Sequence, residues 1–405
     1  MRILFVTGEY PPTPGGIGDY TQQLAAALYA RNHTVSVLTI QARQLLCYTV
    51  VSEQPYAEQR QVLGPARGWG WGLWPALSSA INRLRPEVLH IQYQTGAYAM
   101  QPAINLLPWR LRRMSRRPLI AVTFHDLLEP YLFPKVGQLR RWVSMRLARD
   151  TDLLIATNQP DFDQLSAYRQ RPSRRRNLRL PIAANPTPTL IPIGSNIAVA
   201  PPADYSRAGW RAKLGLAPAT LLIAYFGLLS ASKGIDLVVE ALAQLPGAHL
   251  LIIGGQASAP PDRAFAQQLA ARITALGLGL RITRTGHVSA QEASAHLLAA
   301  DIVALPFRDG ASFRRGSLLA ALAHSCAVIT TAPADSDTAA RLIDGEQVLL
   351  VPPNAGPALS AALTYLAAEP ALRTRLGASG QALAASFSWH TIARSHEQIY
   401  RSGRS

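Results

Sequence analysis

Cysteine is almost absent from this chain of 405 residues, which contains only Cys47 and Cys326. Two distant cysteines exclude a disulfide framework and the paired spacing of a structural metal site. No apolar run approaches the roughly 18 residues that a membrane-spanning helix needs. The apolar run in "MRILFVTGEY" is also too short for the core of a signal peptide. We therefore expect a cytoplasmic protein that holds no metal.

Acidic residues are also scarce, with 24 Asp and Glu against 40 Lys and Arg, a formal net charge of +16. Much of the positive excess falls in three arginine-rich stretches, 110–117, 135–149 and 169–179. Such a positive field attracts anionic membrane surfaces, nucleic acid or phosphorylated substrates. Helix faces with solvated arginines and no charged partner explain the same excess of positive charge equally well. The stretches lack interleaved aromatic residues and no zinc or helix-turn-helix pattern occurs, so we expect no nucleic acid partner. Attachment to the inner face of a membrane stays open.

Three tryptophans, Trp69, Trp71 and Trp74, lie in the glycine-rich stretch 64–75. We expect this stretch to be a loop. Indole rings stack on sugars or lie at a membrane interface, and they also anchor long loops by ordinary hydrophobic contact. With the arginine-rich stretches, the tryptophans favour an acceptor that is held at an anionic membrane.

The apolar residues of the chain form short runs that alternate with alanine-rich amphipathic stretches. This alternation predicts parallel sheets with helices on both faces, and the length predicts two domains. In the first half we expect strands at "RILFVT", "TVSVLT", "EVLHIQY", "PLIAVTFH", "DLLIAT" and "TLIPIG". In the second half we expect them at "LLIAYFG", "HLLIIGG", "LRITRTG", "DIVALPF", "AVITT" and "QVLLVPP".

The two strand series are separated by residues 197–217, which are rich in proline and alanine and predict a linker. We therefore expect an α/β fold of two facing, doubly wound, Rossmann-like domains with a cleft between them. In open parallel sheets ligands bind at the carboxyl ends of the strands. The residues that follow each strand are thus the candidate site residues.

A glycine-rich loop, "GEYPPTPGGIGDY", follows the first strand. Gly15 and Gly16 allow close approach of a ligand, and the following helix directs free amide groups at it. Thr21 replaces the third glycine of the dinucleotide fingerprint, and no acidic residue ends the second strand. These departures argue against a nicotinamide-dependent oxidoreductase. A turn without any ligand is the structural alternative.

Polar residues end two later strands of the first half. His125 and Asp126 end "PLIAVTFHD", and Gln92 and Tyr93 end "EVLHIQY". An imidazole can hydrogen-bond a sugar hydroxyl or a transferring phosphate, and Gln92, Tyr93 and Asp126 suit the hydroxyls of an acceptor. The alternatives are a structural histidine and simple strand caps.

The second half carries a comparable loop in "YFGLLSASKG". Gly227 follows a strand there, and Lys233 lies at the first turn of a helix. An ammonium beside a helix N-terminus suits a diphosphate, because the dipole and the point charge act together. Gly255 ends the next strand, "LLIIGG", in a similar position. A solvated lysine is the alternative.

The ordered motifs resemble those of a known family. In "GGIG", "FHD", "IPIGSN", "FG" with "SKG", "IIGG", "TGHVS", "AADIVALPF" and "FSWHTIA", the chain resembles family 4 of the retaining glycosyltransferases, which have the GT-B fold. The resemblance covers Arg2 to about Tyr400. It implies an acceptor domain at 1–198, a donor domain at 199–384, and a last segment, 385–405, that crosses back as a helix.

The resemblance also implies an activity. A hexosyl group would pass from a nucleotide-sugar donor to a saccharide or lipid-linked acceptor with retained configuration, in surface polysaccharide or glycolipid synthesis. No metal or other cofactor is expected. Gly16 would lie near the donor phosphate and sugar, His125 would contact the transferring sugar, and Lys233 would neutralise the diphosphate. His287 and Val288 would present backbone groups to the base.

The chain departs from the family pattern at the donor site. Leu228 occupies the place of an arginine that usually follows the glycine of "FG". Ser312 and Ala320 occupy the places of two glutamates that usually contact the donor sugar and the ribose. The sequence therefore leaves a second reading open, a GT-B-fold binding protein that has lost turnover.

The stretch "PFRDGASFRRGS" offers replacements for the missing groups. Arg314, Arg315, Gly316 and Ser317 lie where the sequence predicts a helix start, an arrangement that binds phosphate. We expect these residues to bind the donor together with Ser312, and Asp309 to replace the first carboxylate. A surface loop with solvated arginines is the alternative.

Overall fold

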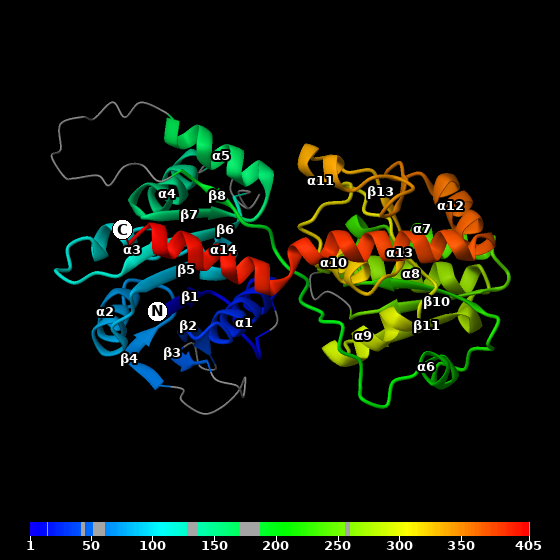
Figure 1. Ribbon diagram of the computed structural model, residues 1–405, viewed down its shortest axis with the longest axis horizontal. Coiled ribbons are helices and arrows are strands. Elements are labelled where there is room, and N and C mark those ends of the chain that lie inside the picture. The colour runs from blue at the N-terminus through cyan, green and yellow to red at the C-terminus, as the bar shows by residue number, and fades with distance from the viewer. Residues whose placement is uncertain are drawn as a thin grey trace. The chain divides into compact units, whose positions relative to one another are not determined.

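The computed structural model describes residues 1–13, 15–41, 45–51, 61–127, 137–170, 187–255 and 260–404. The chain forms two compact units, of which unit 1 comprises Met1–Ile193 with Trp389–Ser405 and unit 2 comprises Gly194–Ser388. Each unit contains one sheet with helices on both of its faces (Figure 1). From residue 171 onward, the arginine-rich stretch 169–179 lies outside the described residues.

The sheet of unit 1 has eight strands in the order β4-β3-β2-β1-β5-β6-β7-β8. Their bounds are β1 (Arg2–Thr7), β2 (Thr34–Gln41), β3 (Leu45–Val50), β4 (Gln61–Arg67), β5 (Val88–Gln94), β6 (Leu119–Asp126), β7 (Leu153–Ala156) and β8 (Thr189–Leu190). The six predicted strands are present and pair in parallel. The order reverses between β1 and β5, which is the switch point where such sheets bind ligands.

Two strands of unit 1, β3 and β4, are not predicted by the sequence pattern. They pair antiparallel at one edge of the sheet. Gly64 and Pro65 interrupt β4 and usually mark loops, but an edge strand tolerates them because its outer backbone groups need no partner. The predicted loop 64–75 therefore begins as a strand and ends as a helix.

The sheet of unit 2 has six parallel strands in the order β11-β10-β9-β12-β13-β14. Their bounds are β9 (Leu221–Phe226), β10 (Ala248–Ile253), β11 (Ile282–Gly286), β12 (Ile302–Leu305), β13 (Ala327–Thr331) and β14 (Leu349–Val351). These are the six strands that the sequence predicts. The order reverses between β9 and β12, so the loops after these two strands flank the switch point.

The helices follow the alternating pattern of both sheets. In unit 1 they are α1 (Gly16–Tyr29), α2 (Leu73–Leu84), α3 (Leu107–Leu111), α4 (Gly137–Asp150), α5 (Gln159–Gln170) and α14 (Trp389–Ser402). In unit 2 they are α6 (Arg207–Lys213), α7 (Ile235–Ala243), α8 (Pro260–Ala275), α9 (Ala290–Ala299), α10 (Gly316–Ala323), α11 (Ser336–Arg341), α12 (Gly356–Ala368) and α13 (Pro370–Ala384). Within the described residues, no helix has the length and apolar character to span a bilayer.

Side chains of β1 show how the sheet of unit 1 separates two cores. Successive residues of a strand point to opposite faces. Ile3 and Phe5 pack in a cluster with residues of α1 and α14. Leu4 and Val6 pack in another cluster with residues of α2, α3, α4 and α5. The sheet is therefore covered on both faces, as the strand pattern predicts.

The predicted linker, residues 197–217, contains α6 and belongs to unit 2. Arg207 and Arg211 of this helix both pair with Asp301, at N–O distances of 2.6 and 3.0 Å. Asp301 also accepts a hydrogen bond from the backbone N–H of Leu222 at 2.8 Å. The linker prediction is wrong here because a residue about 90 positions away fixes the helix, a contact that local composition does not reveal.

The last helix, α14, is part of unit 1. Glu397 accepts hydrogen bonds from the Arg31 guanidinium at 2.9 and 2.5 Å. The Tyr400 hydroxyl lies 2.6 Å from Nδ1 of His90 in the centre of the sheet. Both contacts bring the end of the chain onto the first strands and helix, so α14 completes the core of unit 1.

Three imidazoles of unit 1 make its stability depend on pH. Burial lowers the pKa of His125 to about 3 and that of His396 to about 4, and it holds the pKa of His90 well below the usual range. In the unfolded chain these groups titrate near 6.5, a value typical of free histidine. Below about pH 6.5 the unfolded state therefore binds more protons than the folded state.

We expect the melting temperature to fall as the pH drops from about 7 to about 5, because each buried histidine removes up to about 1.4 kcal/mol of unfolding free energy per pH unit. Scanning calorimetry measures this dependence. His396→Gln should reduce the slope, whereas the control His287→Gln, at an exposed position of unit 2, should keep it. Equal slopes in His396→Gln and the unmodified protein would contradict the assignment.

Candidate functional site

The loops after β9, β10 and β11 meet at the carboxyl edge of the unit 2 sheet. The Gly227 N–H donates to the Ile253 carbonyl at 2.9 Å. A Cβ at Gly254 would lie 2.5 Å from the Gly227 oxygen, and φ at Gly254 is +124°, so glycine is required there. A Cβ at Gly255 would lie 3.7 Å from the backbone nitrogen of His287. The fold thus brings Gly227, Gly255 and His287 together.

Lys233 is held over the first of these loops. It ends a short 3-10 turn, η4 (Ala231–Lys233), that precedes α7. Gly234 follows with φ of +66°, and a Cβ there would lie 2.2 Å from the Pro306 carbonyl oxygen. The Lys233 ammonium lies 3.1 Å from the place that a Cβ at Gly227 would take. Close packing of two glycines therefore positions the ammonium at the switch point.

The surroundings of Lys233 disfavour its charge. Burial lowers the pKa of this ammonium, and the positive charge of Arg315 lowers it further, while Asp262 raises it. Arg315 is a second cation at this edge of the sheet, because it precedes α10 in the loop after β12. A bound anion would relieve this repulsion, which makes the switch point of unit 2 a candidate anion site.

Arg315 is the N-terminal cap of α10. Its guanidinium carbon lies 4.9 Å from the centre of the Phe307 ring, and its Nη2 forms an ion pair with Asp309. Its backbone N–H donates to the Ser312 carbonyl at 2.9 Å. The Arg315 side chain is only 25% exposed. The structure therefore holds this arginine at the helix start and does not leave it in solvent.

The neighbours of Arg315 occupy less constrained positions. Gly316 and Ser317 form the first turn of α10, and the Arg314 N–H donates to the Ser312 hydroxyl at 3.3 Å. The Asp309 side chain is 59% exposed and is paired with Arg315. The prediction that Asp309 replaces the first glutamate of the family stays a prediction. In addition, its ion pair with Arg315 orients the guanidinium of that arginine.

Arg308 is a residue of this site that the sequence reasoning missed. Its guanidinium donates to the Ala231 carbonyl at 2.9 Å, to Asn354 at 2.6 Å and to Asp236 at 2.5 Å. These bonds tie the loop after β12 to the turn that carries Lys233. The partners lie 46 to 77 positions away, so no local pattern signals the role.

The family departures have visible consequences in unit 2. Leu228 is 50% exposed, a large apolar side chain where the family pattern has a cation. Ala320 is fully buried within α10, so the position of the second glutamate holds a small apolar side chain. Val288 precedes Ser289, whose hydroxyl accepts a hydrogen bond from the Glu292 N–H at 3.2 Å and caps α9.

In the described parts of the chain, no group of three His, Cys, Asp or Glu side chains could hold a metal ion.

The glycine loop of unit 1 lies at its own switch point, after β1. Gly15 caps α1, and a Cβ at Gly15 would lie 1.9 Å from a carboxyl oxygen of Glu9. Burial and, to a smaller degree, Asp19 raise the pKa of Glu9. Gly16 begins the helix with open space at its Cβ position. Glu9 is thus a carboxyl group beside the loop that the motif alone did not single out.

His125 is oriented by the side chain of Gln92. The His125 Nε2 lies 2.7 Å from Oε1 of Gln92, an atom that only accepts. This contact assigns the proton to Nε2 and leaves Nδ1 as an acceptor. The Tyr20 ring packs edge-on against the imidazole, with 4.6 Å between the ring centres. The ring of His125 is therefore fixed in both tautomer and direction.

A chain of polar contacts continues from Gln92 to the last helix. The Gln92 amide nitrogen lies 3.5 Å from Nε2 of His90, and that nitrogen lies 2.7 Å from the Thr123 hydroxyl. The opposite nitrogen of His90 contacts the Tyr400 hydroxyl. All four of these side chains are buried. Residues from β5, β6 and α14 thus support His125, and only His125 and Gln92 were predicted to have a role.

Gln92 and Tyr93 do not occupy the predicted acceptor positions. Both side chains are buried, and the Tyr93 hydroxyl accepts a hydrogen bond from Asn105 at 2.6 Å. Neither reaches the surface of unit 1, so they have positioning and packing roles in place of contact with an acceptor. Asp126 is partly exposed at the end of β6, and its acceptor role stays a prediction.

Comparisons with known proteins bear on both units. A family model described as a glycosyl transferase 4-like domain matches residues 15–181, and one described as glycosyl transferases group 1 matches residues 220–369. A D-inositol 3-phosphate glycosyltransferase of Mycolicibacterium gilvum is 32% identical over 399 residues, which cover 93% of this chain and 83% of that protein.

Other relatives match over a shorter length. A D-inositol 3-phosphate glycosyltransferase of Kineococcus radiotolerans is 29% identical over 228 residues, 52% of this chain and 51% of that protein. A protein of the same name from Segniliparus rotundus is 26% identical over 261 residues, 63% of this chain and 53% of that protein. The chain thus spans about half the length of these two relatives.

Solved structures share the fold. Sucrose-phosphate synthase of Thermosynechococcus elongatus has a TM-score of 0.71 at 21% identity, covering 99% of this chain and 98% of that chain. Anabaena HepE, in complex with UDP and glucose, has a TM-score of 0.69 at 19% identity, and the match covers 99% of this chain and 100% of that chain. These similarities confirm the predicted GT-B fold class. With the family models and the 32% identical relative, they show that the chain belongs to the glycosyl transferases group 1 family.

Proposed function

We propose that this protein is a glycosyltransferase that moves a hexosyl group from a nucleotide-sugar donor to a saccharide or lipid-linked acceptor. Membership of the family supports glycosyl transfer as the reaction class. The structures of HepE with UDP and with UDP-glucose support a nucleotide-sugar as the donor. The observation that carries the proposal is the pair of cations, Lys233 and Arg315, in the loops after β9 and β12 that flank the switch point of unit 2.

In this proposal the cation pair binds the diphosphate of the donor. Lys233 contributes a point charge over the Gly227 loop, and Arg315 contributes a planar guanidinium that forms paired hydrogen bonds with phosphate oxygens. The free N–H groups at the start of α10 add to the same field. Arg315 thereby replaces the arginine whose place Leu228 occupies.

The same charges would accelerate the reaction. Cleavage of the glycosidic bond leaves negative charge on the nucleoside diphosphate, and preorganised cations stabilise that charge as it forms. Lys233 and Arg315 would supply this stabilisation without a metal. Retention of configuration at the anomeric carbon is part of the proposal and comes from the family resemblance.

His125 has a different task in the proposed reaction. Its Nε2–H is committed to Gln92, so its Nδ1 is the nitrogen that can accept a hydrogen bond from a sugar hydroxyl. The low pKa of His125, about 3, keeps the ring neutral under ordinary conditions. It is therefore a positioning group for the sugar and not a general acid.

The cellular role is the least constrained part of the proposal. We place the reaction in surface polysaccharide or glycolipid synthesis, in the cytoplasm or at the inner face of a membrane. The net charge of +16 supports an anionic acceptor or surface. A binding protein without turnover is the competing function, favoured by the exposed Leu228 and the buried Ala320.

We expect UDP, GDP or ADP to raise the melting temperature of the protein, because a ligand of the folded state stabilises it. Lys233→Ala and Arg315→Ala should each weaken the affinity of that nucleotide by about tenfold, the equivalent of one charged hydrogen bond. Arg272→Ala removes an ion-paired arginine of α8 and serves as the control.

Two results would change the proposal. Unaltered nucleotide affinity in Arg315→Ala would return that arginine to the role of a surface residue. Tight nucleotide binding without hydrolysis or transfer, across a panel of nucleotide sugars, would favour the binding protein.

We expect Gln92→Leu to lower kcat by roughly tenfold with little change in nucleotide affinity, because the His125 ring loses its acceptor partner. Gln92→Glu keeps an acceptor oxygen and adds a charge that raises the pKa of His125, so its activity should decline toward acid pH. Steady-state kinetics over a range of pH check both effects. A normal kcat and pH profile in both variants would refute this role of Gln92.

A further inference from the structure

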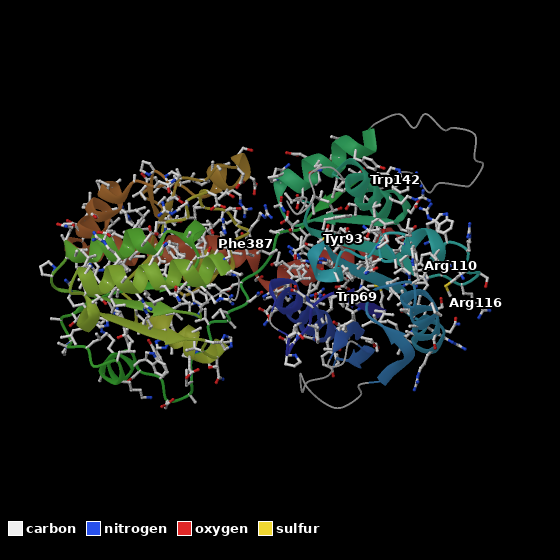
Figure 2. All side chains as sticks on the ribbon, turned by 180° about the vertical axis from the view of Figure 1, so that it is seen from behind. Trp69, Tyr93, Arg110, Arg116, Trp142 and Phe387 are labelled. Atoms are coloured by element: carbon white, nitrogen blue, oxygen red, sulfur yellow. The ribbon has the colours of Figure 1, made fainter. Side chains whose placement is uncertain are left out.

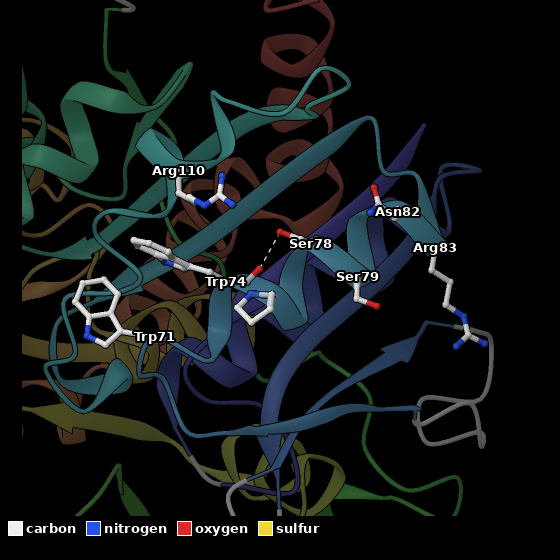
Figure 3. Close-up of a pocket in the computed structure, with 8 residues that line it drawn as sticks. Trp71, Trp74, Ser78, Ser79, Asn82, Arg83 and Arg110 are labelled. Carbon is white, nitrogen blue, oxygen red and sulfur yellow. Dashed lines mark hydrogen bonds between the residues drawn. The ribbon is translucent and has the colours of Figure 1, made fainter.

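Unit 1 carries an open groove of about 790 Å³ along the outer side of α2 (Figure 3). The opposite side of this helix is buried in the core through residues such as Leu73 and Leu77. Most groove residues come from α2 and the turn before it, and Arg110 comes from α3. The volume lies within the range of about 300–1,000 Å³ typical of small-molecule sites.

One end of the groove is an aromatic platform. Trp74 is anchored, since its indole N–H donates to the Ala103 carbonyl at 2.9 Å. Trp71 packs edge-on against Trp74, with 4.9 Å between ring centres and an interplanar angle of 81°. Trp71 is still 55% exposed. By contrast, Trp69 is buried against Tyr98 and only anchors the loop. The Trp71 ring is therefore a supported surface on which a sugar ring can stack.

The rest of the groove is polar and positively charged. Ser79, Asn82 and Arg83 follow the platform along exposed α2, and the Arg110 side chain lies beside Trp74 (Figure 3). Among the described residues, none that lines the groove is acidic, and Arg83 and Arg110 form no ion pair with any of them. The groove thus combines hydroxyl and amide groups with two guanidinium groups that no described carboxylate neutralises.

Neighbouring arginines do not have the same freedom. Arg112 pairs with Asp150 at 3.9 Å, and Arg117 donates to Asp152 with an ion-pair distance of 2.5 Å. Figure 2 shows Arg110 and Arg116 at the surface of unit 1. Some arginines of the stretch 110–117 thus form ion pairs within unit 1, and others face solvent. Among them, Arg110 lines the groove.

We propose that this groove binds an anionic saccharide. Trp71 would stack on a pyranose ring, Ser79 and Asn82 would hydrogen-bond hydroxyls, and the arginines would pair with carboxylate or phosphate groups of the glycan. None of the predicted transfer residues, such as Gly16, His125 or Asp126, lines the groove. It is therefore a glycan site additional to the transfer site. The proposal rests on the proposed function in one respect, because the anionic character of the glycan follows from the acceptor proposed there.

The chemistry of the groove favours a glycan over a lipid surface. Insertion into a bilayer needs several apolar side chains that protrude together. Here Trp71 is the one large apolar side chain of the lining that is mostly exposed. The remaining lining of hydroxyl, amide and guanidinium groups matches a ligand with many hydroxyl groups and acidic substituents.

Calorimetric titration of the full chain with hexagalacturonate, an acidic oligosaccharide, tests the proposal. We expect binding that weakens by about tenfold in Trp71→Ala and in the double variant Arg83→Gln with Arg110→Gln. Maltohexaose, which is neutral, should bind more weakly. Trp142→Ala and Arg116→Gln alter exposed positions outside the lining and should bind as the unmodified protein does.

Three outcomes would overturn the proposal: no binding to hexagalacturonate, equal binding by all variants, or binding only to phosphatidylglycerol vesicles. Melting curves establish that each variant is folded. Nucleotide affinity, measured in the same samples, tests unit 2 separately. A failure of the groove is thus distinguishable from a failure of the proposed transfer reaction.

Discussion

The site in unit 2 depends on two like charges in the loops after β9 and β12, where the strand order reverses. Lys233 is fixed by the close approach of Gly227, Gly234 and the Pro306 carbonyl, and the charge of Arg315 lowers the pKa of the lysine. Such a pair costs free energy in the empty protein. A bound anion would offset that cost, so the geometry of these two loops favours an anion.

The candidate site of unit 1 depends on a network of uncharged polar side chains. A chain of buried polar groups leads from Tyr400 through His90 and Gln92 to His125. Burial keeps the histidines neutral, and satisfied hydrogen bonds make their burial tolerable. A series of contacts thus connects the last helix of the chain with His125, whose ring is oriented directly by Gln92 and Tyr20.

The large positive charge of the chain is divided among distinct tasks. Arg211 and Arg308 fix loops and helices by donating hydrogen bonds to carboxylates and backbone carbonyls. Arg315 combines a structural partner, Asp309, with a position at a helix start. Arg83 and Arg110 lie in an exposed groove with aromatic and hydroxyl neighbours. The net charge is therefore better understood as several local sites than as one uniform field.

The sequence by itself determined the two series of parallel strands, the glycine loops at their carboxyl ends and the family, because local periodicity and short motifs carry that information. It did not predict the edge strands β3 and β4, the helix α6, the clamp formed by Arg308 or the burial of Gln92. The helix α6, the Arg308 clamp and the burial of Gln92 depend on partners that are distant in the chain, whereas β3 and β4 pair with near neighbours but lack a clear strand pattern because Gly64 and Pro65 interrupt β4. Only the tertiary structure decides which polar side chain meets another polar group and which meets solvent, because burial is a property of the packed molecule and not of a local pattern.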